Sequence, residues 1–87
     1  MRKRDSLLIH MEILSSLIAE PMGPTRLAQA CNVNYGRIAG FTGPLLEKGL
    51  IRTEVRDGQE VFAVTDEGYR VYADWVEIWR RLPLGVT

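Results

Sequence analysis

The sequence predicts an α+β domain that is mostly helical. Three stretches in the first half of the chain repeat apolar residues at helical spacing. Between residues 50 and 64 the apolar residues alternate instead, on either side of Asp57-Gly58, a pair that favours a two-residue hairpin turn. Residues 66–82 return to helical spacing. At 87 residues the chain has room for one small core.

The first helix is expected to begin at Asp5 or Ser6, because either side chain can accept from a free backbone N–H group. It is expected to end near Glu20, since Pro21 disfavours helical geometry at the preceding residue. His10 lies beside the apolar face and is interpreted as a packing residue rather than a ligand or a pH switch. The residues expected to face the core are Leu7, Met11, Ile13, Leu14, Leu17 and Ile18.

A second helix is predicted from Pro24 to Cys31, because proline suits a first turn that needs no N–H group. Asn32-Val33-Asn34 is expected to form a turn, with Asn34 as the N-cap of a third helix that ends at Gly49. Two short helices around a tight turn form a helix-turn-helix. The third helix is expected to direct inward Ile38, Phe41, Leu45 and Leu46.

Pro44 is the unusual residue of the third helix. It cannot donate a hydrogen bond to the Gly40 carbonyl, and its ring crowds that carbonyl. In a helix interior glycine costs about 1 kcal/mol and proline about 3 kcal/mol relative to alanine. A kink or break is therefore expected near Gly43, with a final turn that restarts at Pro44, and this argues against a straight helix that contacts base edges.

Strands are predicted at 50–56 and 59–64. A two-residue turn between them places Arg56 opposite Gln59 and Ile51 opposite Val64. This register collects apolar residues on one face of the hairpin, namely Ile51, Thr53, Val55, Phe62 and Val64. The other face carries the polar residues Arg52, Glu54, Arg56 and Gln59.

Thr65 is expected to cap a last helix from Asp66 to about Leu82. This helix carries two apolar stripes, where a helix docked on one domain needs only one. The first contains Tyr69, Tyr72, Val76 and Trp79, and the second contains Val71, Trp75, Ile78 and Leu82. Because one stripe would stay exposed, a coiled-coil homodimer with antiparallel helices is predicted. Its expected interface residues are Tyr72, Trp75, Val76, Trp79 and Leu82.

Two alternatives remain for the last helix. Both stripes can wrap into the core of a monomer. Trp75 and Trp79 can form a ligand cage, although their spacing of four favours packing. The predicted division is a domain over 1–64 with a short basic tail, followed by a dimerisation helix over 65–87 that belongs to the same compact unit.

This order of elements is that of a winged helix-turn-helix, with the hairpin as the wing. Four shorter pieces of the sequence add to this order, namely Thr25-Arg26-Leu27, Asn34-Tyr35, the LEKGLI of residues 46–51 and the VTDEG of residues 64–68. With these pieces the sequence resembles the small archaeal winged-helix regulators and chromatin-type DNA-binding proteins over residues 5–82. The resemblance implies one winged domain and a C-terminal helix that pairs with a second subunit. Thr42 departs from it, because leucine is usual there.

The composition excludes several classes of protein. Lysine plus arginine and aspartate plus glutamate both number 11, which removes bulk positive charge as an argument for nucleic-acid binding. There is no cluster of metal ligands and no glycine-rich phosphate loop, so no enzyme and no cofactor are predicted. Cys31, the one cysteine, rules out an intrachain disulfide and is interpreted as a small buried residue.

A cytoplasmic, nucleoid-associated location is expected. The basic start at Arg2, Lys3 and Arg4 precedes an apolar run, but His10 and Glu12 interrupt it, so it is interpreted as an amphipathic helix rather than a signal peptide. No stretch approaches about 18 uninterrupted apolar residues, so no membrane span is predicted.

In a winged helix the third helix usually enters the major groove, and the wing contacts phosphate or the minor groove. Residues 21–58 hold five basic and three acidic side chains, which gives a mildly positive surface. Asn34 can instead be consumed as an N-cap, Tyr35 can be a half-buried packing residue, and each arginine can be a solvated surface residue. The candidate DNA-binding residues are Arg26, Asn32, Asn34, Tyr35, Arg37, Arg52 and Arg56.

The predicted function is a homodimeric DNA-binding transcriptional regulator or architectural protein, with duplex DNA and a second copy of the chain as partners. No small-molecule ligand is evident. The alternative is a winged-helix module for protein–protein contact, which the neutral charge and the interrupted third helix would favour.

Overall fold

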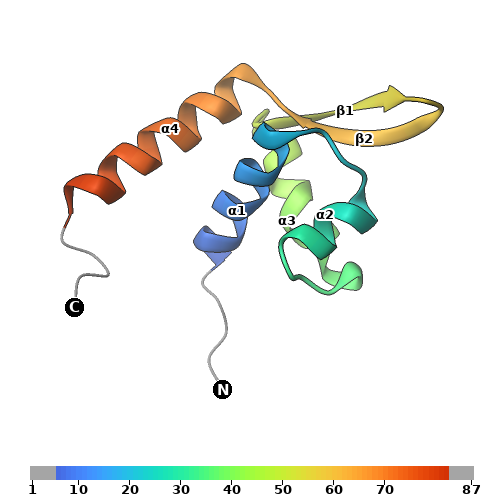
Figure 1. Cartoon of the computed structure of the whole chain (residues 1–87), viewed down its shortest axis with the longest axis horizontal. Helices are drawn as coiled ribbons and strands as arrows, with labels where there is room; N and C mark the ends of the chain where they lie inside the picture. Colours follow the sequence, from blue (N-terminus) through green and yellow to red (C-terminus); the bar gives the residue numbers. More distant parts are fainter. Residues whose placement is uncertain (1–5, 83–87) are drawn as a thin grey trace.

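The computed structural model of the chain describes residues 6–82 and confirms the mostly helical α+β fold (Figure 1). The elements follow the predicted order. They are α1 (Ser6–Ala19), α2 (Pro24–Ala30), α3 (Tyr35–Glu47), β1 (Ile51–Arg56), β2 (Gln59–Val64) and α4 (Asp66–Arg81).

α1 is the central helix of the fold. It contacts α2 and α3 on one side and α4 on the other. The hairpin of β1 and β2, which we call the wing, and α4 extend in opposite directions from the point where they join (Figure 1). The wing and the α2–α3 pair therefore lie on the side of the molecule away from the end of α4.

The hydrophobic core lies between α1, α2, α3 and the base of the wing. The largest fully buried side chains are Ile13, Leu14, Leu17, Leu27 and Ile51. Each fully buried aliphatic side chain of this size contributes about 1.5–3 kcal/mol of transfer free energy. The same core holds α2 and α3 in place, so it positions the helix-turn-helix.

α1 differs from the prediction at its start. Asp5, one of the two predicted caps, lies outside the described residues. Leu7 was expected in the core but is 49% exposed, and Ile9 is buried instead. The reason is that the buried face of α1 follows Ile9, Ile13 and Leu17, which recur every four residues. The His10 ring packs edge-on against Phe41 of α3, with the ring centroids 5.5 Å apart.

α3 begins as predicted, since Asn34 is its N-cap and accepts a hydrogen bond from the Gly36 N–H at 2.7 Å. The expected break is wrong, because α3 continues as one helix through Pro44. A proline clashes with the Cβ of the residue before it in helical geometry, and Gly43 has no Cβ. Leu46, expected inside, is 37% exposed, and Thr42 takes an inward position at 3% exposed.

The wing has the predicted register, from Arg56 opposite Gln59 to Ile51 opposite Val64. Asp57 and Gly58 both have positive φ, at 53° and 76°, as a type I′ turn requires. Met22 adds an unpredicted bridge, because its backbone exchanges two hydrogen bonds with Phe62 on the outer edge of β2. The segment before α2 is thus tied to the wing.

α4 begins at the predicted cap, where the Thr65 hydroxyl accepts from the Gly68 N–H at 3.0 Å. Val71, Tyr72 and Trp75 pack against the core. Tyr69, Ile78, Trp79 and Leu82 remain 42–56% exposed. No helix within residues 6–82 is both long enough and apolar enough to cross a membrane.

Candidate nucleic-acid interface

The turn between α2 and α3 exposes three of the predicted site residues. Asn32 has a left-handed backbone, with φ of 54°, at the point where the chain reverses. The Asn34 side-chain oxygen accepts the N-cap hydrogen bond, so its amide nitrogen is the group left to contact a ligand. Tyr35, at the first turn of α3, is 60% exposed, which rules out the half-buried packing role.

Arg37 lies on the exposed side of α3, and its guanidinium group packs against an aromatic ring of the same helix. The guanidinium carbon is 5.5 Å from the centroid of the Phe41 ring, one turn further along. A guanidinium group over an aromatic face is held by the ring quadrupole while its N–H groups remain free to donate at its edge. Phe41 itself contacts His10, so the core of the fold supports Arg37 through two rings.

Arg26 lies on the exposed face of α2 and forms an ion pair with Glu20 at the end of α1. A shallow groove runs between the start of α2 and strand β2, with Arg26 and Val61 among its lining residues. This groove places Arg26 beside the wing, so α2 connects the turn residues to the wing.

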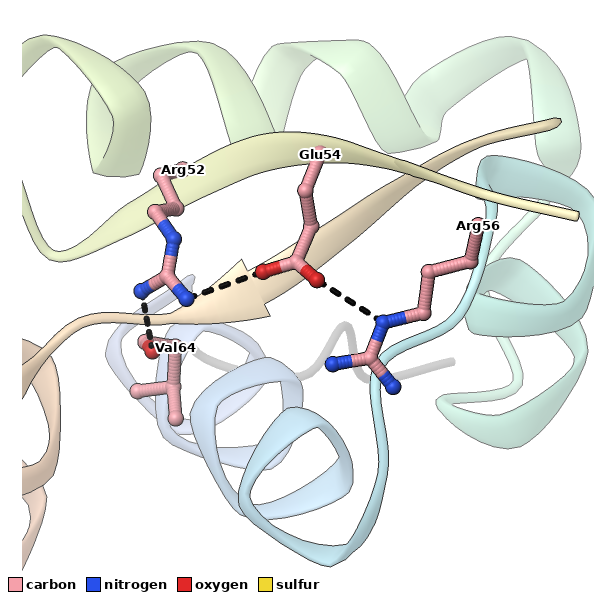
Figure 2. A network of polar contacts seen from close by, with 4 residues as sticks. All are labelled: Arg52, Glu54, Arg56 and Val64. Atoms are coloured by element: carbon pink, nitrogen blue, oxygen red, sulfur yellow. Dashed lines mark hydrogen bonds and ion pairs between the residues drawn. The ribbon is translucent and has the colours of Figure 1, made fainter. Parts of the chain in front are cut away.

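The wing carries an ion-pair network on one face (Figure 2). The Glu54 carboxylate lies between two arginines and accepts from Arg52 Nη2 at 2.9 Å and from Arg56 Nε at 2.8 Å. Arg52 also donates to the Val64 carbonyl at 3.3 Å. The side chains of Arg52 and Arg56 are 57% and 56% exposed, against 23% for Glu54. The two cations thus flank the carboxylate and are more exposed than it is.

The hydrogen bond from Arg56 is the main reason that the pKa of Glu54 lies below its ordinary value. Partial desolvation opposes this shift, and the charges of Arg56 and Arg52 reinforce it. A lowered pKa keeps the carboxylate ionised, so the network is intact near neutral pH. It is lost only as the pH falls through this lowered pKa.

The structure therefore divides the seven predicted residues into two groups. Asn32, Asn34, Tyr35 and Arg37 gather around the start of α3, and Arg52 and Arg56 share the wing, with Arg26 on α2 beside it. Sequence reasoning missed the partners of the arginines, namely Glu20, Phe41 and Glu54. The alternating Arg52-x-Glu54-x-Arg56 spacing on a strand was a usable signal, because alternate residues share one face.

Within residues 6–82 no group of three or more histidine, cysteine, aspartate or glutamate side chains could hold a metal ion. Cys31 is buried, and its sulfur lies 3.6 Å from the Ser16 hydroxyl. A buried thiol in such surroundings is a packing residue.

Comparisons with known proteins agree with the order of helices and strands described above. The sequence matches the model of a protein family described as winged helix-turn-helix over residues 3–82. A search of curated protein sequences found no match.

Solved structures share the fold at low identity. The transcriptional regulator BldR from Sulfolobus solfataricus is 23% identical with a TM-score of 0.77, and the match covers 85% of this chain and 55% of BldR. The PcaV transcriptional regulator from Streptomyces coelicolor is 27% identical with a TM-score of 0.72, over 83% of this chain and 57% of PcaV. This chain therefore spans little more than half the length of these regulators.

A third match is similar in length to this chain. Sso10a-2, a DNA-binding protein from Sulfolobus solfataricus, is 17% identical with a TM-score of 0.70, and the match covers 90% of this chain and 84% of Sso10a-2.

Proposed function

The chain belongs to the winged helix-turn-helix family, and from this premise we propose that it is a transcription regulator that binds duplex DNA as a homodimer. The observation that carries the proposal is the exposed start of α3, where Tyr35 and Arg37 project from the second helix of the helix-turn-helix. A helix in this position fits the major groove, and the wing then lies along the backbone or the minor groove. The expected target is chromosomal DNA in the cytoplasm.

The proposal assigns base contacts to the start of α3. Arg37 can donate two parallel hydrogen bonds to guanine, and the amide nitrogen of Asn34 can donate to a base or a phosphate. We assign Tyr35 and Asn32 to the adjacent DNA backbone, because both are exposed beside Arg37. Because the chain carries no net charge, we expect modest affinity for each domain and a clear dependence on salt.

Replacing Arg37 with alanine is expected to weaken binding to the preferred DNA sequence by about 1–3 kcal/mol, the value of one good base contact. The measurement is a salt-titrated binding assay on random and genomic duplexes, which first identifies the preferred sequence. Arg70→Ala removes the same charge from the exposed side of α4 and is the matched control. Equal binding by a folded Arg37→Ala variant and by Arg70→Ala would remove α3 from the interface. Failure of the unmodified chain to bind any duplex would instead favour a protein partner.

The wing is assigned to the phosphate backbone. Arg56 flanks the turn and its side chain is more than half exposed, so it can reach a phosphate without entering a groove. Arg52 lies nearer the base of the wing and is held by two acceptors. Arg26 completes this backbone surface from α2.

Replacing Arg56 with alanine is expected to weaken binding to all duplexes by a similar factor. The slope of log affinity against log salt should become shallower by about one, because one fewer phosphate is neutralised. The measurement compares these slopes for the preferred and a scrambled sequence. A loss confined to the preferred sequence would mean that the wing contacts bases.

The homodimer is proposed from the uncovered face of α4. Ile78, Trp79 and Leu82 are exposed on one side of the helix, and a soluble monomer seldom leaves such a patch uncovered. Trp79 stacks on Trp75 with ring centroids 5.3 Å apart, so the exposed stripe continues from the core.

The charge pattern of α4 favours an antiparallel pair. The first turn carries Asp66 and Glu67, and the last turn carries Arg80 and Arg81. In an antiparallel pair the acidic start of one helix lies beside the basic end of the other, whereas a parallel pair would place like charges together. Two α3 helices could then bind one duplex, which raises affinity through bivalency.

A further inference from the structure

We propose that Glu54 limits the affinity of the wing for DNA by competing with phosphate for the guanidinium groups of Arg52 and Arg56. The inference rests on the proposed function. According to this inference, an acidic residue controls the part of DNA binding that does not depend on base sequence.

The geometry makes one carboxylate serve two cations. Each oxygen of Glu54 accepts from a different arginine, at 2.9 Å and 2.8 Å, as Figure 2 shows. The face of the wing that bears these three side chains therefore carries two positive charges and one negative charge. In the free protein both arginines already donate to the carboxylate, so part of their positive charge is neutralised before a phosphate approaches.

A phosphate can compete because the two cations are more accessible than the anion between them. Both arginine side chains are more than half exposed, while Glu54 is 23% exposed. A DNA phosphate carries the same charge as a carboxylate. It also offers a guanidinium group a similar arrangement of oxygens. Since exposed ion pairs are weak, Glu54 lowers DNA affinity without preventing binding.

The test compares Glu54→Gln with Glu60→Gln on a random-sequence duplex of about 20 base pairs. Glutamine keeps the size and one acceptor oxygen of the side chain but removes its charge. Glu60 lies opposite Val55 on the other face of the wing, and within residues 6–82 it has no ion pair, so Glu60→Gln controls for net charge.

Glu54→Gln is expected to bind about 5-fold more tightly than the unmodified chain near physiological salt, and Glu60→Gln at most about 2-fold. The slope of log affinity against log salt should become steeper by up to about one for Glu54→Gln, because Arg52, released from the carboxylate, then neutralises a phosphate in addition to Arg56. A role in wing folding alone would leave this slope unchanged. Circular dichroism and thermal unfolding serve to check that both variants are folded.

A second comparison assigns the effect to the arginines. In an Arg52→Ala/Arg56→Ala background, adding Glu54→Gln is expected to give no more gain than Glu60→Gln. Equal gains from the two glutamine variants in the unmodified background would overturn the inference while leaving DNA binding in place. A gain that persists without the arginines would overturn it too. No duplex binding by any variant would overturn the proposed function and the inference together.

Discussion

Replacing Gly68 with alanine is expected to destabilise the folded chain by about 3 kcal/mol or more, the upper end of the cost of forcing atoms into a packed interior. A Cβ at this position would lie 2.0 Å from the Leu50 carbonyl oxygen and 2.8 Å from a methyl carbon of Val64. The first of these atoms is backbone, and it accepts the Thr65 N–H at 3.1 Å. It cannot withdraw without breaking that hydrogen bond.

The measurement is the midpoint of urea unfolding, followed by circular dichroism at one fixed protein concentration. Gly40→Ala is the matched control, because Gly40 is also helical but has nothing within 4 Å of its Cβ position. Alanine there is expected to stabilise the chain by about 0.5–1 kcal/mol, since glycine is the poorer helix former. Equal midpoints for Gly68→Ala and the unmodified chain would show that α4 does not need this close approach.

Gly68 has this importance because it lies where three elements meet. The Thr65 hydroxyl accepts from the Gly68 N–H and donates to the Gly49 carbonyl at 2.7 Å. Gly49, with φ of 73°, is the residue that ends the turn after α3. The start of α4 is therefore fixed to the segment between α3 and the wing. A pair of α4 helices would fix the relative positions of two α3 helices through this junction.

The parts of the fold that the sequence predicts are those that local chemistry determines. The turn at Asp57-Gly58 accommodates positive φ at two consecutive residues, which sets the register of the whole wing. Asn34 and Thr65 were identified as caps because their side chains satisfy free N–H groups of the next helix. Both strands and all four helices follow from such local signals.

The failures depend on tertiary packing. Leu7 and Leu46 are apolar at helical spacing, yet both are exposed, because the neighbouring elements cover Ile9 and Thr42 instead. The break expected near Gly43 is wrong because propensity scales treat proline apart from the residue before it, and Gly43 removes the clash of the Pro44 ring with a preceding Cβ.

The candidate site shows the same division. Sequence patterns could assign each arginine to a helix or a strand, but the charge that an arginine offers to DNA depends on its neighbours. Arg26 is paired with Glu20, whereas Arg37 is supported by an uncharged ring. The charges along residues 21–58 predict a mildly positive surface. They do not show that Glu54 neutralises part of the wing, because that depends on which side chains meet in the fold. The ion pair of Arg26 joins residues on two helices and requires the folded structure.

Replacing Trp79 with glutamate is expected to convert the proposed dimer into monomers. Trp79 is 42% exposed in the single chain, and it lies on the stripe that the partner helix would cover. A tryptophan that acts as a hot spot of an interface contributes about 2 kcal/mol or more, which corresponds to about 30-fold in the dissociation constant. Glutamate would add the cost of burying a charge beside the partner's apolar stripe. Trp79→Phe keeps an aromatic ring that can stack on Trp75, and is the control expected to remain dimeric.

Light scattering at micromolar concentration measures the mass. A value near the 9.9 kDa of one chain for the unmodified protein would refute the dimer, and twice that value supports it. Because Trp79 contacts Trp75 near the far end of α4, Trp79→Glu is expected to keep the helical content that circular dichroism records. Affinity for a duplex with two binding sites should then fall by about 100-fold through lost bivalency, although no proposed DNA contact is altered. Affinity for a duplex with one site should change little, and a loss of equal size on both duplexes would mean that α4 acts on the winged domain rather than through a second copy.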